Sequence, residues 1–165
     1  MSMHSFLAVM LVAAGFWLQT PKDWTAIVPQ ATTQAELTME FGPPDEVVAT
    51  FPWSEWSATW KRRPVTRNYL LRYAKERSQS RLLNGPAGPA DSVDVHIADK
   101  KVIAVEWMHG GPTARAAAAR IRADPEVRST NAQEPLKWAK DAINGTLSFE
   151  VASDDSQVRA FYQMK

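Results

Sequence analysis

The chain has 165 residues, of which 45% are hydrophobic and 22% charged, and its 19 Lys and Arg side chains nearly balance its 18 Asp and Glu side chains. This composition is typical of a folded globular chain, and it argues against disorder and against a strongly basic nucleic-acid-binding protein. Because the sequence contains no cysteine, it excludes disulfides, thiolate zinc sites, cysteine nucleophiles and an acylated cysteine.

The N-terminal segment is strongly apolar. Phe6–Leu18 contains only apolar residues and glycine, and its 13 residues would span about 20 Å as a helix, whereas a membrane span needs about 20 residues. We therefore predict that residues 1–20 are a secretory signal peptide, with an uncleaved anchor or a helix of the core as the alternatives. Residues 21–31 are expected to form a linker, and residues 32–165 a single domain.

The first half of the domain begins with a helix signal. Thr32–Gly42 is expected to form a short helix, in which Thr32 or Thr33 and Glu36 provide a capping box. Asp45–Thr50 then leads into a strand.

The next segments favour strands. The tryptophans at positions 53, 56 and 60 fit one face of a helix, but the alternation of Trp56, Ala58 and Trp60 and the following Pro64 favour a strand. Val65–Ala74 also alternates and is predicted as a strand, with a helix through Leu83 as the alternative. Residues 84–89, Asn-Gly-Pro-Ala-Gly-Pro, indicate a loop.

A β-hairpin is expected in the middle of the chain. Its first strand alternates Val93, Val95 and Ile97 with polar residues, and its second strand is the run VIAVEW at residues 102–107. A turn centred on Asp99-Lys100 would pair Ile97 with Val102 and Val95 with Ala104. Because the second strand has apolar residues on both faces, we expect it to be a central strand.

The C-terminal third is predicted to contain two helices and a second hairpin. The helices are Thr113–Ala123, which is rich in alanine, and Glu134–Ile143, which has Pro135 in its first turn and Asn144-Gly145 at its end. The hairpin joins residues 147–151 to residues 158–162. The expected fold is therefore α+β, with an antiparallel sheet of about five to six strands and about three helices.

The sequence gives little sign of catalysis. Its three histidines are His4, His96 and His109, of which His96 and His109 could approach each other across the hairpin, with Asp94 on the face of His96. This set is too small for a convincing metal site. Motifs for a nucleophile, a zinc protease or a phosphate loop are not found in the sequence. We predict no enzyme activity, no metal and no cofactor, with a small hydrolase that uses surface carboxylates as an alternative.

Charge patterning suggests a binding surface instead. Residues 61–81 contain eight basic side chains and one acidic one, next to several aromatic residues. Such a combination is typical of contacts with anionic partners. The alternative is a solvated face whose cations pair with acids of the same chain. The predicted binding residues are Trp53, Trp56, Trp60, Arg62, Arg63, Arg67, Tyr69 and Arg72.

The order of elements at residues 32–107 resembles the SmpA/OmlA (BamE-like) family of small outer-membrane-assembly lipoproteins and the wider β-lactamase-inhibitor-like fold group. The resemblance is carried by TTQAELTMEFGPPDEVV, by Trp56, Trp60 and Tyr69, and by DSVDVHIADKKVIAVEW. The chain departs from the family in lacking the cysteine that is acylated. The resemblance implies an envelope protein that binds proteins or lipid and has no catalytic residues.

These observations lead to one expected function. We expect a non-enzymatic binding or scaffold module of the cell envelope that is exported, periplasmic or membrane-associated. Its expected partner is a protein in the envelope or in a membrane complex, with anionic lipid or polysaccharide as alternatives, and nucleic acid is not expected. A different possibility is an accessory subunit of a membrane complex, held by an uncleaved N-terminal helix.

Overall fold

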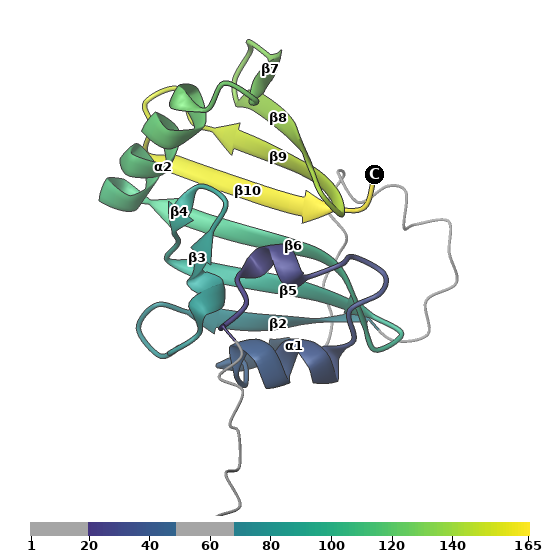
Figure 1. The fold of residues 1–165 in the computed structure, drawn as a ribbon. Helices are drawn as coiled ribbons and strands as arrows, with labels where there is room; N and C mark the ends of the chain where they lie inside the picture. Colours follow the sequence, from purple (N-terminus) through teal and green to yellow (C-terminus); the bar gives the residue numbers. More distant parts are fainter. Residues whose placement is uncertain (1–19, 49–67) are drawn as a thin grey trace, which may run out of the picture.

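The computed structural model describes residues 20–48 and 68–165. In these two ranges the chain is mostly β: one eight-stranded antiparallel sheet, one two-stranded sheet and two α-helices (Figure 1). The expectation of an α+β fold with about five to six strands and about three helices is therefore wrong. The main physical reason is that a segment expected to be a helix pairs as a strand and widens the sheet.

The large sheet is built from two meanders. Its spatial order is β1-β2-β5-β6-β10-β9-β8-β7, so the first meander ends at β6, which lies beside β10, the last strand of the second. The strands are β1 (Glu46–Val48), β2 (Asn68–Ala74), β5 (Ser92–Ala98), β6 (Lys101–Gly110), β7 (Arg128–Asn131), β8 (Leu136–Ala142), β9 (Gly145–Val151) and β10 (Gln157–Gln163). Because β6 is central and paired on both sides, its predicted central position is confirmed.

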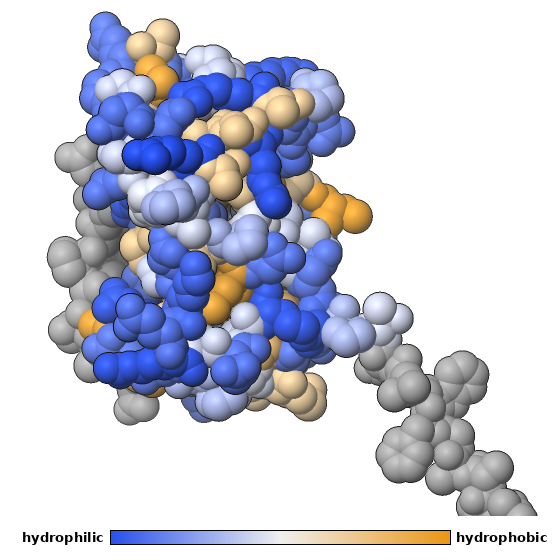
Figure 2. Space-filling view, turned by 90° about the vertical axis from the view of Figure 1, so that its left-hand side faces the viewer, coloured by the Kyte–Doolittle hydropathy of each residue, from blue (hydrophilic) through white to orange (hydrophobic). Residues whose placement is uncertain are grey.

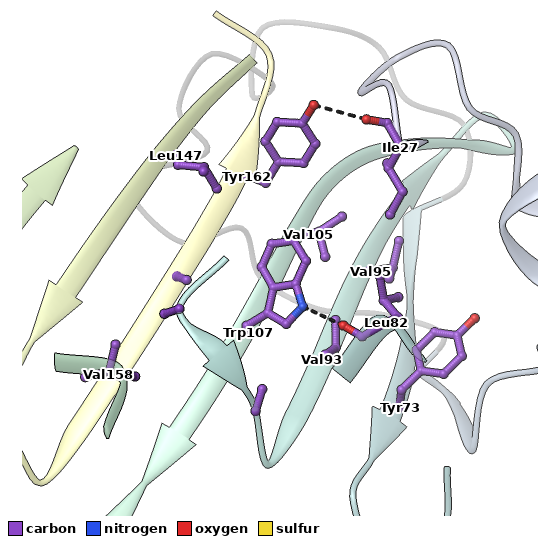
Figure 3. Close-up of a cluster of buried hydrophobic side chains, with 14 of the residues drawn as sticks. Ile27, Tyr73, Leu82, Val93, Val95, Val105, Trp107, Leu147, Val158 and Tyr162 are labelled. Carbon is purple, nitrogen blue, oxygen red and sulfur yellow. Dashed lines mark hydrogen bonds between the residues drawn. The ribbon is translucent and has the colours of Figure 1, made fainter. Parts of the chain in front are cut away.

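One face of the sheet carries the hydrophobic core. Alternate residues of β2, β5, β6, β10 and β9 point to this face, and it holds the largest fully buried side chains, among them Trp107, Tyr73, Tyr162 and Phe149. The indole Nε1 of Trp107 donates a hydrogen bond to the carbonyl oxygen of Leu82 at 2.8 Å (Figure 3). The polar atom of this large ring is thus satisfied inside the core.

Helix α1 (Gln34–Phe41) begins and ends as predicted. Thr33 is its N-cap and forms a capping box with Glu36, and Gly42 ends the helix with a φ of 88°. Leu37 and Phe41 lie one turn apart and are buried against the sheet.

The segment before α1 also packs against the core. It contains a 3-10 helix, η1 (Trp24–Ala26), and Trp24 makes edge-on ring contacts with Trp107 and Tyr162. The side chain of Ile27 is fully buried, and its carbonyl oxygen accepts a hydrogen bond from the Tyr162 hydroxyl (Figure 3). The residues expected to be a linker, 21–31, therefore include a strap held on the core face.

Helix α2 (Gly111–Ala123) confirms the predicted alanine-rich helix. Its buried residues are small except for Ile121, which lets the helix approach β10 and β6 closely. Asp91 accepts hydrogen bonds from the backbone N–H of Gly110 at 2.7 Å and from the hydroxyl of Thr113 at 2.6 Å. The start of α2 is therefore capped by an acid from another segment.

The predicted helix at residues 134–143 is not formed, and Leu136–Ala142 of this segment form strand β8. Leu136 lies opposite Val151 and Trp138 lies opposite Phe149, so alternate residues of this segment extend the core face. Ile143 and Asn144 form a two-residue turn into β9, because Ala142 pairs with Gly145. The Asn-Gly pair thus belongs to a hairpin rather than to a helix end.

The central hairpin is confirmed, with one correction to its register. Asp99 and Lys100 form the turn with φ of 50° and 64°, and Ile97 pairs with Val102. A β-bulge then shifts the ladder, so that Val95 faces Val105 instead of Ala104. Because of this shift, the even-numbered residues from Ala104 onward point away from the core.

The predicted loop at residues 84–89 contains a small hairpin. A 3-10 helix, η3 (Arg81–Leu83), leads into β3 (Asn84–Gly85), which pairs with β4 (Gly88–Pro89). Gly85 lies against the indole of Trp107: a Cβ at this position would be 2.5 Å from Cδ1 of the ring. This close approach requires glycine.

Candidate functional site

The structure places two of the eight predicted binding residues. The other six, Trp53, Trp56, Trp60, Arg62, Arg63 and Arg67, lie outside the described residues. Tyr69 faces Ile97 across the strands on the core side, and its hydroxyl donates a hydrogen bond to Gln34. Arg72 points to the opposite, second face of the sheet. These two residues therefore do not share a surface.

Arg72 is held by acids of the same chain. Its Nε and Nη2 donate hydrogen bonds to both oxygens of Asp94 at 2.8 and 3.0 Å, and its Nη1 lies 3.4 Å from Glu46. The hydrogen bonds that Arg72 donates to Asp94 raise the pKa of Arg72 against the opposing effect of burial. For Arg72, the structure therefore agrees with the alternative interpretation, in which the basic side chains of this region pair with acids of the same chain.

Arg81 has a similar structural role. Its guanidinium donates hydrogen bonds to the carbonyl oxygens of Lys22 at 2.6 Å and Glu40 at 2.8 Å, and it lies over the ring of Phe41. It therefore joins η3 to α1 and to the strap.

The second face carries a row of charges that crosses six neighbouring strands. We call this row the charge ladder, and in strand order its members are Glu46, Arg72, Asp94, Glu106, Arg159 and Glu150. At the β10 end of this row, Arg159 donates a hydrogen bond from Nε to Glu106 at 2.8 Å, and its Nη1 lies 3.5 Å from Glu150. Each arginine of the ladder thus bridges one acid near the middle of the sheet and one acid further out.

The middle of the ladder is buried. Asp94 and Glu106 are directly opposite each other on β5 and β6, and each is only 6% exposed. His96 is on the same face, with its Nε2 3.5 Å from a carboxylate oxygen of Glu106. Two like charges placed opposite each other in a sheet destabilise it unless cations compensate. The two arginines provide this compensation from either side.

The electrostatics of the pair do not suit acid catalysis. Burial raises the pKa of Glu106, but hydrogen bonds from His96 and the charge and hydrogen bonds of Arg159 outweigh it, so the net shift is downward. A general acid at neutral pH needs a raised pKa, and a general base is weakened by a lowered one. In this arrangement Glu106 remains ionised and holds an arginine in place.

The two central histidines lie on opposite faces of the sheet. His96 pairs with Ala104 on the second face, whereas His109 pairs with Val158 on the core side and is 4% exposed. The possibility that these histidines approach each other across the hairpin is therefore wrong, because their side chains point to opposite faces of the sheet. Among the residues that the structure describes, no cluster of three or more His, Asp and Glu could hold a metal ion.

The sequence reasoning missed Glu106 and Arg159. Glu106 is the single acid in the run VIAVEW, and Arg159 is the single cation in QVRAFY. A charged residue inside a strand that is otherwise apolar on both sides is unusual, since isolated buried charges are costly. Pairing the two runs in register, with Arg159 opposite Met108 and Phe161 opposite Glu106, would have placed these two charges as diagonal neighbours on one face of the sheet.

The described surface shows little apolar area that could serve as a contact site. Figure 2 shows that the side carrying α2 is mostly hydrophilic, with apolar side chains in small separate patches. Among the described residues, the exposed large hydrophobic side chains are Met39, Val47, Ile143 and Met164.

Comparison with family models, with curated proteins and with solved structures finds no match to this chain. The resemblance at residues 32–107 therefore stays a prediction. Neither helix in the described part of the chain is long and apolar enough to span a membrane.

Proposed function

We propose that this protein is a non-enzymatic binding module of the cell envelope, which contacts a protein partner through its Trp/Arg-rich region (residues 53–72). The observation that carries the proposal is the charge ladder, because Arg72 belongs both to this region and to the ladder. The side chains of Arg72 and Arg159 are 37% and 43% exposed, whereas the side chains of Asp94 and Glu106 behind them are each 8% exposed.

Such arginines suit recognition for a physical reason. A free arginine loses much side-chain entropy when it is immobilised in an interface. In the ladder, hydrogen bonds to buried acids already fix the guanidinium, so docking costs less entropy. Arginine is also enriched in protein interfaces and at their energetic centres. The ladder therefore supports a contact surface that is formed before the partner arrives.

The alternative of a small hydrolase has one observation in its favour, which is the buried, facing pair of Asp94 and Glu106. Each acid of the pair is bound to an arginine, and the pKa of Glu106 is lowered. These contacts support a role in positioning charge rather than in transferring protons. A turnover reaction that is lost in E106Q would establish the hydrolase instead.

The proposal includes export of the protein. Its support is the apolar N-terminal segment and the envelope family that residues 32–107 resemble. Mass spectrometry of the native N-terminus tests this part: a mature chain that starts near residues 15–25 agrees with export. An intact Met1 or Ser2 would indicate the accessory subunit that keeps its N-terminal helix.

The binding proposal is tested by capture from native membranes. The full chain, a charge-reversal variant (R62E/R63E/R67E) and a control reversal of two arginines on α2 (R115E/R120E) are compared, and bound proteins are identified by mass spectrometry. We expect the same partner with the native chain and the α2 variant, reduced capture at high salt, and loss with the triple variant. An identical set of proteins with all three chains would refute the proposal, and binding to anionic vesicles alone would replace the protein partner with lipid.

A further inference from the structure

A short stretch of the chain between β2 and β5 lies over the core beside α2. We call residues 81–90 the cover segment, and they comprise η3, β3 and β4. The β3–β4 hairpin lies in front of β6 and next to α2, which β4 contacts (Figure 1). The cover segment buries Leu82, Ala87 and Ala90, each at most 2% exposed. It therefore closes the core above the C-terminal half of β6.

Two rings of β6 hold the cover segment. Trp107 donates a hydrogen bond to the carbonyl oxygen of Leu82 at 2.8 Å, and Nε2 of His109 lies 3.4 Å from the carbonyl oxygen of Gly88. Within the described residues, β3 and β4 pair only with each other, so these side chains replace the backbone ladder as the attachment to the large sheet. Of the two rings, only the imidazole titrates between about pH 5 and 8.

The surroundings of His109 suit the neutral ring. The residue is 4% exposed, and among the described residues its Nδ1 has no well-formed hydrogen bond, although the backbone of Val158 is near. Protonation would place a second N–H and a charge at this buried position. Burial lowers the pKa of His109, and the backbone of Gly88 and Val158 and the charge of Asp91 only partly oppose this shift.

One acid lies near enough to attract a protonated His109. Asp91 follows the cover segment, and its charge raises the pKa of the ring. Its Oδ2, however, accepts hydrogen bonds from Gly110 and Thr113 at the start of α2, and its Oδ1 lies 3.8 Å from Nζ of Lys75. This carboxylate is therefore engaged by other donors, and it forms no salt bridge with His109.

The neighbouring elements place an apolar residue and a cation around the ring. Val158 of β10 is opposite His109. From α2, the guanidinium of Arg120 lies against Gly88, where a Cβ would be 2.6 Å from Nη1. A cation beside the carbonyl that faces His109 disfavours a second positive charge there. The ring would therefore take up a proton more readily in water than beneath the cover segment.

We propose that the cover segment is a pH-sensitive latch, in which protonation of His109 releases residues 81–90 from β6 and uncovers Trp107. The cover segment moves rather than α2, because its strands have two residues each, whereas α2 has buried residues along its length and is capped by Asp91. The latch lies apart from the Trp/Arg-rich region, and the inference does not rest on the proposed binding function.

The direction of the pH dependence follows from linkage. The open form binds a proton with the ordinary pKa of histidine, about 6.5, and the closed form binds it only at lower pH. The closed form is thus fully stabilised above about pH 6.5. As the pH falls below this value, opening becomes more favourable by up to about tenfold per pH unit, until the closed form is itself protonated.

Hydrogen–deuterium exchange of the full chain between about pH 7.5 and pH 5, corrected for the intrinsic rate and read by mass spectrometry, tests the latch. We expect protection of residues 81–90 to fall at least several-fold, while protection of β9 and β10 stays unchanged. H109Q cannot titrate, so its cover segment should exchange equally at both ends of this range. H96Q removes the other buried histidine, on the second face, and should leave the pH dependence as in the native chain.

Three results would overturn the latch: equal protection at both ends of the pH range, a native pH dependence in H109Q, or a loss spread evenly over β9 and β10, which indicates unfolding of the whole sheet. If H109Q does not fold, the native chain decides. The fall in protection must then begin near pH 6.5 and level off at the pKa of the His109 ring measured by NMR. A fall that does not follow this titration refutes the role of His109.

Discussion

Replacing Arg159 with methionine would leave the carboxylate of Glu106 buried beside Asp94 without its main cation. Breaking a fully buried ion pair costs about 3–5 kcal/mol, and hydrogen bonds to a charged group contribute about 1.5–3 kcal/mol. Because Arg159 is 43% exposed, water screens part of the interaction, and we expect a loss of about 2 kcal/mol at pH 7. For a chain of this length, that corresponds to a fall in Tm of about 4–8 °C.

The pH dependence makes this prediction specific. In the native chain the pKa of Glu106 lies below its ordinary value of 4.5, so its stabilising effect is present above that pH and is lost as the pH falls. In R159M, burial is no longer opposed by the arginine and the pKa of Glu106 moves up. Protonation then removes the buried charge, so the difference in stability between the two proteins should be largest near pH 7 and shrink toward pH 4.

Urea unfolding of both proteins at these two pH values measures the difference. R122M is the matched control, because Arg122 pairs with Asp155 at the surface; its cost should be about 0–1 kcal/mol. The double variant R159M/E106Q should recover part of the loss at pH 7, since it removes the uncompensated charge. A loss for R159M that is equal at both pH values would refute the electrostatic explanation.

Three further predictions concern the core face. Burial lowers the pKa of His109 against weaker opposing hydrogen bonds, so stability should fall as the pH drops below about 6.5, and H109Q should flatten this part of a pH–stability curve. G85A should cost about 1–3 kcal/mol and alter the near-UV circular dichroism, because its Cβ would displace the indole of Trp107; unchanged spectra would contradict this. T33A should cost about 1 kcal/mol in thermal unfolding through loss of the α1 cap, whereas T33S should be nearly neutral.

Local signals predicted several elements correctly. Thr33 and Glu36 mark the start of α1, and the alternation from Val93 to Ile97 followed by Asp99-Lys100 marks the central hairpin. In each case the deciding interactions are close in sequence, as in a cap or a two-residue turn.

The errors arose where distant pairing decides the structure. Residues 134–143 contain good helix formers, but Leu136 and Trp138 are stabilised by Val151 and Phe149 across the strands. The bulge in β6 reversed the faces expected for Ala104 and Val105, and with them the position of Glu106. A single inserted residue moves every later side chain of the strand to the opposite face of the sheet. The middle of the charge ladder was therefore not recognisable from the alternation alone.

Stability of the sheet does not by itself explain why the ladder is charged. A buried ion-pair network is often no more stable than well-packed apolar residues of similar size, and the same face already buries Leu70, Ala104 and Phe161. Buried charges can also fix strand register, since a one-residue slip would bring Asp94 and Glu106 into the apolar core. Register needs the two buried acids, and the acids need Arg72 and Arg159 as counter-ions. Neither role requires the guanidiniums to stay more than one-third exposed, as they do, and these exposed guanidiniums are the part of the ladder that a partner could contact.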